Sequence, residues 1–180
     1  MSEENEKFHA SMFRPIDCSD KTLNAFAKIV LANGEVPAEN LQRGIPTAEM
    51  LFFCSIGRKL VGVSCARFQN TSFHKLLFDR AGVPQMYNPF SVEICWLSVL
   101  PKYQGKGAWS AIYEIRRKYL KDRPAHGITR VENKRVADVA RYGYQQVGEP
   151  FKLDNEDHFI RLVVKDHDPV FNPSKRLRYC

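Results

Sequence analysis

The residues best suited to chemistry stand at positions 104 to 109, where the sequence reads Gln-Gly-Lys-Gly-Ala-Trp. Positions 92 to 99 before them form an apolar run typical of a central strand, and a helical pattern begins at Gly107. A glycine-rich turn that opens a helix presents backbone N–H groups at the positive end of the helix dipole. Because Lys102 and Lys106 flank these groups, the segment predicts a site for a phosphate or pyrophosphate.

Two well-known glycine-rich phosphate motifs do not fit this turn. The dinucleotide fingerprint requires a third glycine at the position where this chain has Ser110. A P-loop requires Gly-Lys followed by Ser or Thr, whereas Lys106 is followed by Gly107. A plain connection between a strand and a helix remains the alternative interpretation.

The elements that would position the turn follow from hydrophobic periodicity and from cap residues. Helices are expected at 21–32 (with Asp20 as cap), 73–81, from Gly107 to before Pro124, and from Asn133 to 142; strands are expected at 50–56, 60–68, 92–99, 126–131, near Val147 and at 158–164. This order predicts one α/β domain with a mixed, mostly antiparallel sheet flanked by helices. We expect residues 1–11 to be frayed, 12–165 to form the domain, and 166–180 to form a basic tail.

Composition limits the classes of function. The 180 residues carry a formal net charge of +7, which favours anionic partners without choosing among them. The longest apolar run, 50–54, is too short to cross a membrane, and the N-terminus lacks the apolar core of a secretory signal. We therefore expect a cytoplasmic protein with no membrane partner. The cysteines are scattered and form no C-x-x-C pair, and the histidines form no H-x-x-x-H pair. The sequence therefore predicts no metal site.

From Val99 to Gly107 the sequence VLPKYQGKG, opening a helix, resembles the acyl-CoA-binding segment of the GNAT superfamily of acyltransferases. The resemblance covers about residues 50–165. It includes KLVGV, then FHKLLFDRA followed by EICW as in a bacterial and phage subgroup, and TRVEN followed by RYGY. The sequence departs from the family at Trp109, where a small residue is usual, and at Val139, where a tyrosine often acts as the acid.

The resemblance implies an N-acyltransferase that moves an acyl group, most simply acetyl, from coenzyme A to an amine by direct attack on the thioester. It places the cofactor against Leu97, Ser98, Val99, Gln104, Gly105, Lys106, Gly107, Ala108, Trp109 and Asn133. Glu93 is the candidate base, because an apolar strand disfavours the charged form of a carboxylate, and Tyr142 is the candidate acid. A carboxylate paired with arginine, and a tyrosine packed in the core, are the alternative interpretations.

The acceptor stays open, since a small amine, an antibiotic, a peptide N-terminus and a lysine all fit. Two other functions also stay open. One is an N-acyl synthase that takes its acyl group from an acyl-carrier protein. The acidic surface of that carrier protein would dock on basic residues of this chain. The other is a non-catalytic protein that binds nucleic acid or a protein through a basic helix face. That face would comprise Arg116, Arg117, Lys118, Lys121 and Arg123. Nucleic acid is the less favoured partner, and a homodimer is compatible with the sequence.

A hydrolytic triad is a weaker hypothesis for this chain. Ser98, His126 and Asp138 supply the three residue types that such a triad needs. No nucleophile-elbow motif accompanies them, so the sequence does not support this reading.

Overall fold

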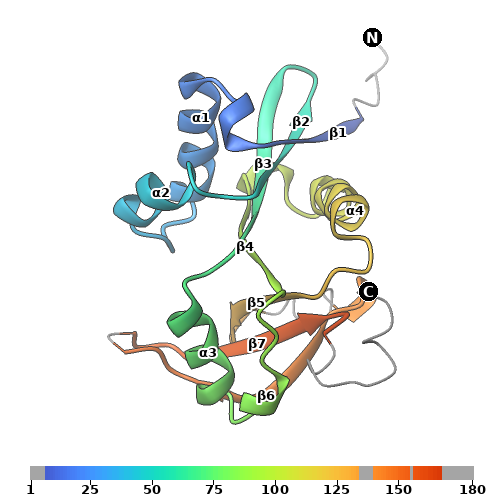
Figure 1. Cartoon of the computed structure of the whole chain (residues 1–180). Helices are drawn as coiled ribbons and strands as arrows, with labels where there is room; N and C mark the ends of the chain where they lie inside the picture. Colours follow the sequence, from blue (N-terminus) through green and yellow to red (C-terminus); the bar gives the residue numbers. More distant parts are fainter. Residues whose placement is uncertain (1–6, 134–139, 155, 168–180) are drawn as a thin grey trace, which may run out of the picture. The chain divides into compact units, whose positions relative to one another are not determined.

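A computed structural model of the whole chain describes residues 7–133, 140–154 and 156–167 (Figure 1). The strands described there follow the order β1-β2-β3-β4-β5-β7-β6 in one mixed, mostly antiparallel sheet with helices, as predicted. The chain divides into two compact units, Met1–Arg67 with Ile94–Lys121, and Phe68–Glu93 with Asp122–Cys180. Strand β4 (Val92–Val99) runs from the second unit into the first, and each unit is described by itself.

The first unit contains the antiparallel strands β1 (Phe8–Phe13), β2 (Met50–Ile56) and β3 (Lys59–Arg67). Strands β2 and β3 form the predicted hairpin. Strand β1 corrects the expectation that residues 1–11 are frayed, because residues 8–11 pair with β2 from Phe8↔Ile56 onward. The polar residues His9 and Ser11 interrupt this segment, so its composition gave little indication of a strand.

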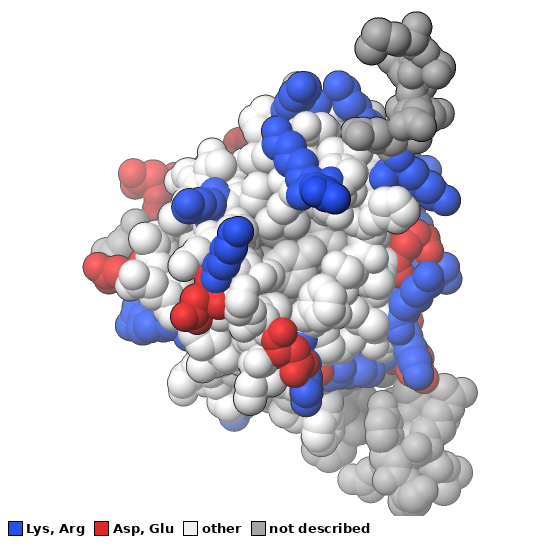
Figure 2. Space-filling view, turned by 90° about the horizontal axis from the view of Figure 1, so that it is seen from above, with Lys and Arg blue, Asp and Glu red and all other residues white. Residues whose placement is uncertain are grey.

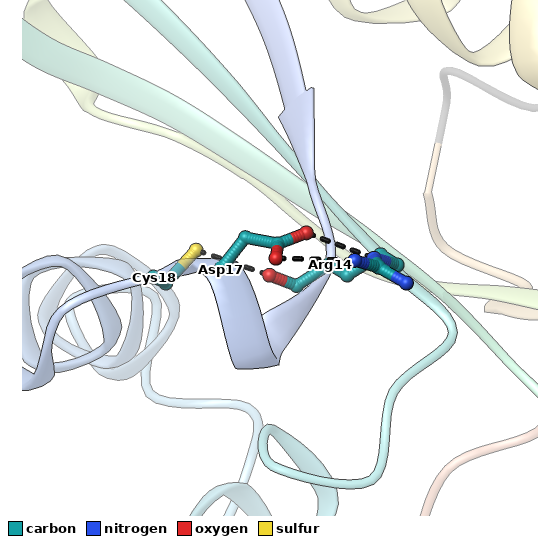
Figure 3. Close-up of polar contacts among 3 residues, drawn as sticks. All are labelled: Arg14, Asp17 and Cys18. Carbon is teal, nitrogen blue, oxygen red and sulfur yellow. Dashed lines mark hydrogen bonds and ion pairs between the residues drawn. The ribbon is translucent and has the colours of Figure 1, made fainter.

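Helix α1 (Asp20–Leu31) is capped by Ser19, whose Oγ accepts a hydrogen bond from the Thr22 N–H at 3.2 Å. The cap therefore lies one residue before the expected Asp20. A 3-10 turn, Pro15–Asp17, joins β1 to this helix. Figure 3 shows how Arg14 braces this turn: its Nε lies 2.8 Å from Asp17 Oδ2, and its carbonyl accepts from the Cys18 thiol at 3.5 Å.

Helix α2 (Ala38–Gly44) was not predicted, because seven residues after Pro37 carry too little helical periodicity. Helices α1 and α2 pack on one side of the first unit's strands, and helix α4 (Ala108–Leu120) packs on the other, as Figure 1 shows. The α1/α2 side is built on Phe26, Val30, Leu41, Leu51, Phe53, Val63 and Cys65, and the α4 side on Cys54, Val61, Val99, Ala108 and Ile112.

The second unit contains helix α3 (Thr71–Arg80) and strands β5 (Ala125–Arg130), β6 (Gln145–Phe151) and β7 (Ile160–Lys165). Strand β4 pairs in parallel with β5 at Val92↔Ala125 and Glu93↔His126, and β7 pairs antiparallel with both β5 and β6. The apolar side of α3 packs on β6 and β7. The helix expected at 133–142 and the basic tail lie largely outside the described residues.

Candidate functional site

The predicted phosphate turn lies where strand β4 passes into helix α4. A 3-10 turn, Pro101–Tyr103, follows the strand. Gly105 and Gly107 then adopt φ values of +71° and +105°, a left-handed conformation that residues with a Cβ rarely adopt. The Gln104 side chain donates from Nε2 to the Val99 carbonyl oxygen at 2.8 Å, which ties the turn to the end of the strand.

The opening of helix α4 has the properties that an anion requires. Gly107 is its cap residue and provides no side-chain hydrogen bond, and the first bond along the helix runs from the Ala111 N–H to the Gly107 carbonyl at 3.1 Å. The amides of the first turn therefore point out of the helix end, at its positive pole. A Cβ at Gly105 would meet nothing within 4 Å, so a ligand has room to approach. The Gln104 N–H bonds to the Pro101 carbonyl, which leaves Gly105 as the first residue that could face an anion.

Phe8, Tyr103 and Lys59, which the sequence did not single out, lie beside this turn together with the expected Lys102. Phe8 of β1 packs edge-on to Tyr103, with centroids 6.5 Å apart, and lies 3.6 Å from the position of a Cβ on Gly107. The ammonium groups of Lys59 and Lys102 lie 5.4 and 5.9 Å from the centroid of the Tyr103 ring. Phe8 escaped notice because its strand was expected to be frayed, and Lys59 lies far from the turn in sequence.

Two aromatic residues of helix α4, Trp109 and Tyr113, stack on each other one turn apart. The indole of Trp109 stacks on the ring of Tyr113 one turn later, with centroids 6.2 Å apart and planes 28° apart. It packs within the α4 side of the core. Arg116 does not belong to the exposed basic face that was expected, because its side chain is 4% exposed. Its guanidinium lies 4.6 Å from the centroid of the Tyr113 ring. A cationic side chain can therefore serve as core here, with an aromatic ring as a neighbour.

Strand β4 carries a bulge that the sequence did not reveal. Trp96 has a φ of +52° in mid-strand, and side chains of a regular strand alternate between its two sides. Cys95 and Trp96 both pack towards α1 and α2, whereas Leu97 and Val99 pack towards α4. Two consecutive residues on one side break the alternation of a regular strand; we call this irregularity the bulge, and bulges are over-represented next to active sites.

Glu93, the candidate base, is 3% exposed on the part of β4 within the second unit. It stands opposite His126 in the parallel ladder with β5. His126 bonds through Nδ1 to Ser91 Oγ at 2.8 Å and through Nε2 to Gln69 Oε1 at 3.0 Å. Since both ring nitrogens of His126 are occupied and the ring is buried, the triad with Ser98 is not supported; Asp138 lies outside the described residues.

The two remaining site candidates belong to the second unit. Tyr142 is partly exposed, and the Arg141 guanidinium lies 5.9 Å from its ring centroid. Asn133 is exposed, and its Nδ2 donates to Thr129 Oγ1 at 3.0 Å. Their roles as acid and as cofactor contact stay predictions.

Within residues 7–133, 140–154 and 156–167, no three His, Cys, Asp or Glu side chains gather to hold a metal ion. No helix in those ranges is both long and apolar enough to span a membrane.

Charge is spread over the face of the molecule that Figure 2 shows. On the side that Figure 2 shows, Lys and Arg side chains occur at several separate places, with acidic side chains between some of them. On this face the distribution gives a general attraction for anions and does not form one continuous track.

Structural comparison identifies the fold. An acyl-CoA N-acyltransferase from Pseudomonas aeruginosa superposes with a TM-score of 0.65 at 14% identity, over 88% of this chain and 99% of that one. FeeM, an N-acyl amino acid synthase from uncultured soil microbes, gives a TM-score of 0.66 at 12% identity, over 88% and 90%. A ribosomal-protein alanine N-acetyltransferase from Escherichia coli gives 0.62 at 11%, over 91% and 97%.

These similarities establish the fold of the GNAT acyl-CoA N-acyltransferases, to which a neighbour from Desulfovibrio desulfuricans is also assigned. No protein-family model matches the sequence, and no curated protein sequence matches it either. At these identities the similarity concerns the fold, and the chemistry must be argued from the residues of this chain.

Proposed function

We propose that this protein is an N-acyltransferase that takes its acyl group, most simply acetyl, from coenzyme A and transfers it to an amine. The observation that carries the proposal is the turn at Gly105 and Gly107, which opens helix α4 within the acyltransferase fold. The pyrophosphate of coenzyme A needs several donors, and the first-turn amides and nearby lysines are of the right kind. A Cβ on Gly105 would meet nothing within 4 Å, which leaves space for a ligand atom at that position.

The pantetheine arm would run from this turn back along strand β4. Its amide groups can pair with strand backbone, as a neighbouring strand would, at Leu97, Ser98 and Val99. Ladder pairing of β4 with β5 covers Val92 and Glu93, and Leu97 to Val99 lie beyond it. This path brings the thioester alongside the bulge at Trp96.

The reaction requires two proton transfers. The amine loses a proton and attacks the thioester carbonyl, an amide C–N bond forms, the C–S bond breaks, and the departing thiolate gains a proton. Glu93 would take the first proton. It lies three residues before Trp96 on the same strand, and the proton would pass to it directly or through a water. Tyr142 would supply the second proton.

Two glycines provide a matched test of the donor site. Gly105 and Gly34 have φ values of +71° and +69°, and a Cβ at either would meet nothing within 4 Å, so a glutamate strains both backbones alike. Acetyl-CoA should raise the melting temperature of the wild type and of Gly34→Glu, but not of Gly105→Glu, which places negative charge where phosphate belongs. A folded Gly105→Glu protein that binds acetyl-CoA normally would exclude this turn from the site. A screen of amines with thiol detection would then identify the acceptor.

A further inference from the structure

The bulge at Trp96 carries a large side chain next to Leu97–Val99, the stretch of β4 along which the pantetheine arm would run. The indole lies on the α1/α2 side of strand β4, where the ring of Phe26 packs edge-on to it with centroids 6.4 Å apart. The Arg67 guanidinium lies 4.7 Å from the centroid of the indole. Trp96 is only partly buried, so some of its surface faces solvent.

Helix α2 holds the indole in place through its last residue. A Cβ on Gly44 would lie 2.5 Å from Cη2 of Trp96 and 2.9 Å from Cζ2, closer than two carbon atoms can approach. The absence of a side chain at Gly44 therefore allows the indole to lie directly against the helix backbone. With Phe26 and Arg67 also beside it, the indole has little freedom to move, because close packing opposes rotation.

Strand β4 is lined by packed core on both of its sides. On the α4 side, Val99, Ala108 and Ile112 are all 1% exposed or less, so that side is closed core. On the α1/α2 side Phe26 and Leu51 are fully buried, and at the bulge Trp96 on this side and Leu97 on the α4 side are both partly exposed. A chain of several carbons that turns towards the α1/α2 side beyond the thioester would need the volume that the indole fills.

We propose that Trp96 is a specificity-determining residue that limits the donor to short acyl chains. The inference rests on the proposed use of coenzyme A and names the class of acyl group that the same site accepts. An acetyl group ends before the indole, whereas a hexanoyl or decanoyl chain collides with it. Removal of the indole opens an apolar space beside Phe26, into which a longer chain fits.

Calorimetric titration of the full-length chain with coenzyme A, acetyl-CoA, hexanoyl-CoA and decanoyl-CoA tests the proposal. Wild type should bind coenzyme A and acetyl-CoA alike and hexanoyl-CoA at least tenfold more weakly. Trp96→Ala should bind hexanoyl-CoA at least tenfold more tightly than wild type does, since a few methylene groups carry that much discrimination. Its affinity for coenzyme A should not change. Trp96→Phe, a smaller change that preserves an aromatic ring in the core, should shift the preference in the same direction by less.

Val30→Ala is the matched control, because Val30 is buried in the same α1/α2 core and its loss also leaves a cavity. It should lower stability and leave chain-length preference unchanged. Equal binding of acetyl-CoA and decanoyl-CoA by the wild type would overturn the role of Trp96, even if no variant folded. The same preference in wild type and in folded Trp96 variants would overturn it too. Failure of the wild type to bind coenzyme A itself would instead refute the proposed function.

Discussion

The imidazole rings of His74 and His126 stack in the second unit, with centroids 4.2 Å apart and planes 7° apart. The ring of His167 stacks on Phe78 nearby, at 5.1 Å. Among the described residues, His74 Nε2 and both ring nitrogens of His167 have no hydrogen-bond partner. Burial lowers the pKa of His74 to about 4, and burial together with the neighbouring His74 lowers the pKa of His167 to about 4. Both side chains are therefore neutral at physiological pH.

These histidines predict a loss of stability in mild acid. The unfolded chain takes up protons near pH 6.5, whereas the folded chain does so near pH 4. Stability is thus fully present above pH 6.5 and falls between pH 6.5 and 4, with a slope of about 1.4 kcal/mol per pH unit for each histidine. Urea unfolding at pH 7, 5.5 and 4.5 measures the slope. His167→Phe, which keeps an aromatic ring beside Phe78, should flatten it, and an unchanged slope would contradict this account.

A second stability prediction concerns two glycines of the second unit. Gly148 and Gly82 have φ values of +65° and +75°. A Cβ at Gly148 would lie 2.0 Å from the Ala81 carbonyl oxygen, which also accepts from the Glu149 N–H, whereas a Cβ at Gly82 would meet nothing within 4 Å. Gly82→Ala should cost about 1–2 kcal/mol, the usual cost of a left-handed alanine. Gly148→Ala should cost clearly more, because backbone must move. Denaturant unfolding of the two variants gives the loss of stability for each. Equal losses would show that the backbone at Ala81 moves aside at no measurable cost.

The third prediction separates the enzyme from a nucleic-acid-binding protein. We expect weak binding to DNA or RNA that falls steeply with salt, because a net charge of +7 attracts phosphates without a built site. The burial of Arg116 removes one member of the expected basic face. Fluorescence anisotropy at two salt concentrations with two unrelated sequences provides the measurement. Tight, sequence-selective binding at physiological salt would reverse the order of the two hypotheses.

The sequence predicted the elements that carry strong apolar patterns. Strands 50–56 and 92–99 were placed with their observed bounds, and α1, α3 and α4 were recognised by periodicity and turn residues. Strand β1 and helix α2 were missed because each is short and mixed in polarity. Local pattern cannot reveal an element whose main stabilisation comes from a distant partner, as β1 obtains from β2.

The site shows the same division. The two glycines and the opening of α4 could be predicted, because a turn of this kind is local in sequence. The bulge at Trp96 could not be predicted, since it depends on how β4 packs against α1 and α2. A break in the alternation of side chains along a strand leaves no mark on the types of residue present. Lys59 approaches Tyr103 through the β2–β3 hairpin, and such an approach is a property of the folded chain.

The last prediction assigns the base. If Glu93 removes the proton of the acceptor, directly or through a water, Glu93→Gln should keep the shape of the side chain and the affinity for coenzyme A while it lowers kcat. A loss of roughly 10²–10⁴-fold is usual for a positioned acid–base group. The acidic limb of the pH–rate profile should also move, because that limb reports ionisation of the base.

Glu114→Gln is the control for this experiment, because Glu114 lies on the surface of α4 and pairs with Arg117 at 2.8 Å. It should leave both the rate and the profile unchanged. Thiol release with the acceptor found in the amine screen gives the rates, and calorimetry gives the affinity for coenzyme A. Near wild-type turnover of Glu93→Gln with an unchanged profile would make Glu93 a structural residue. The amine would then have to arrive neutral or lose its proton to solvent, since the attack requires a free electron pair on nitrogen.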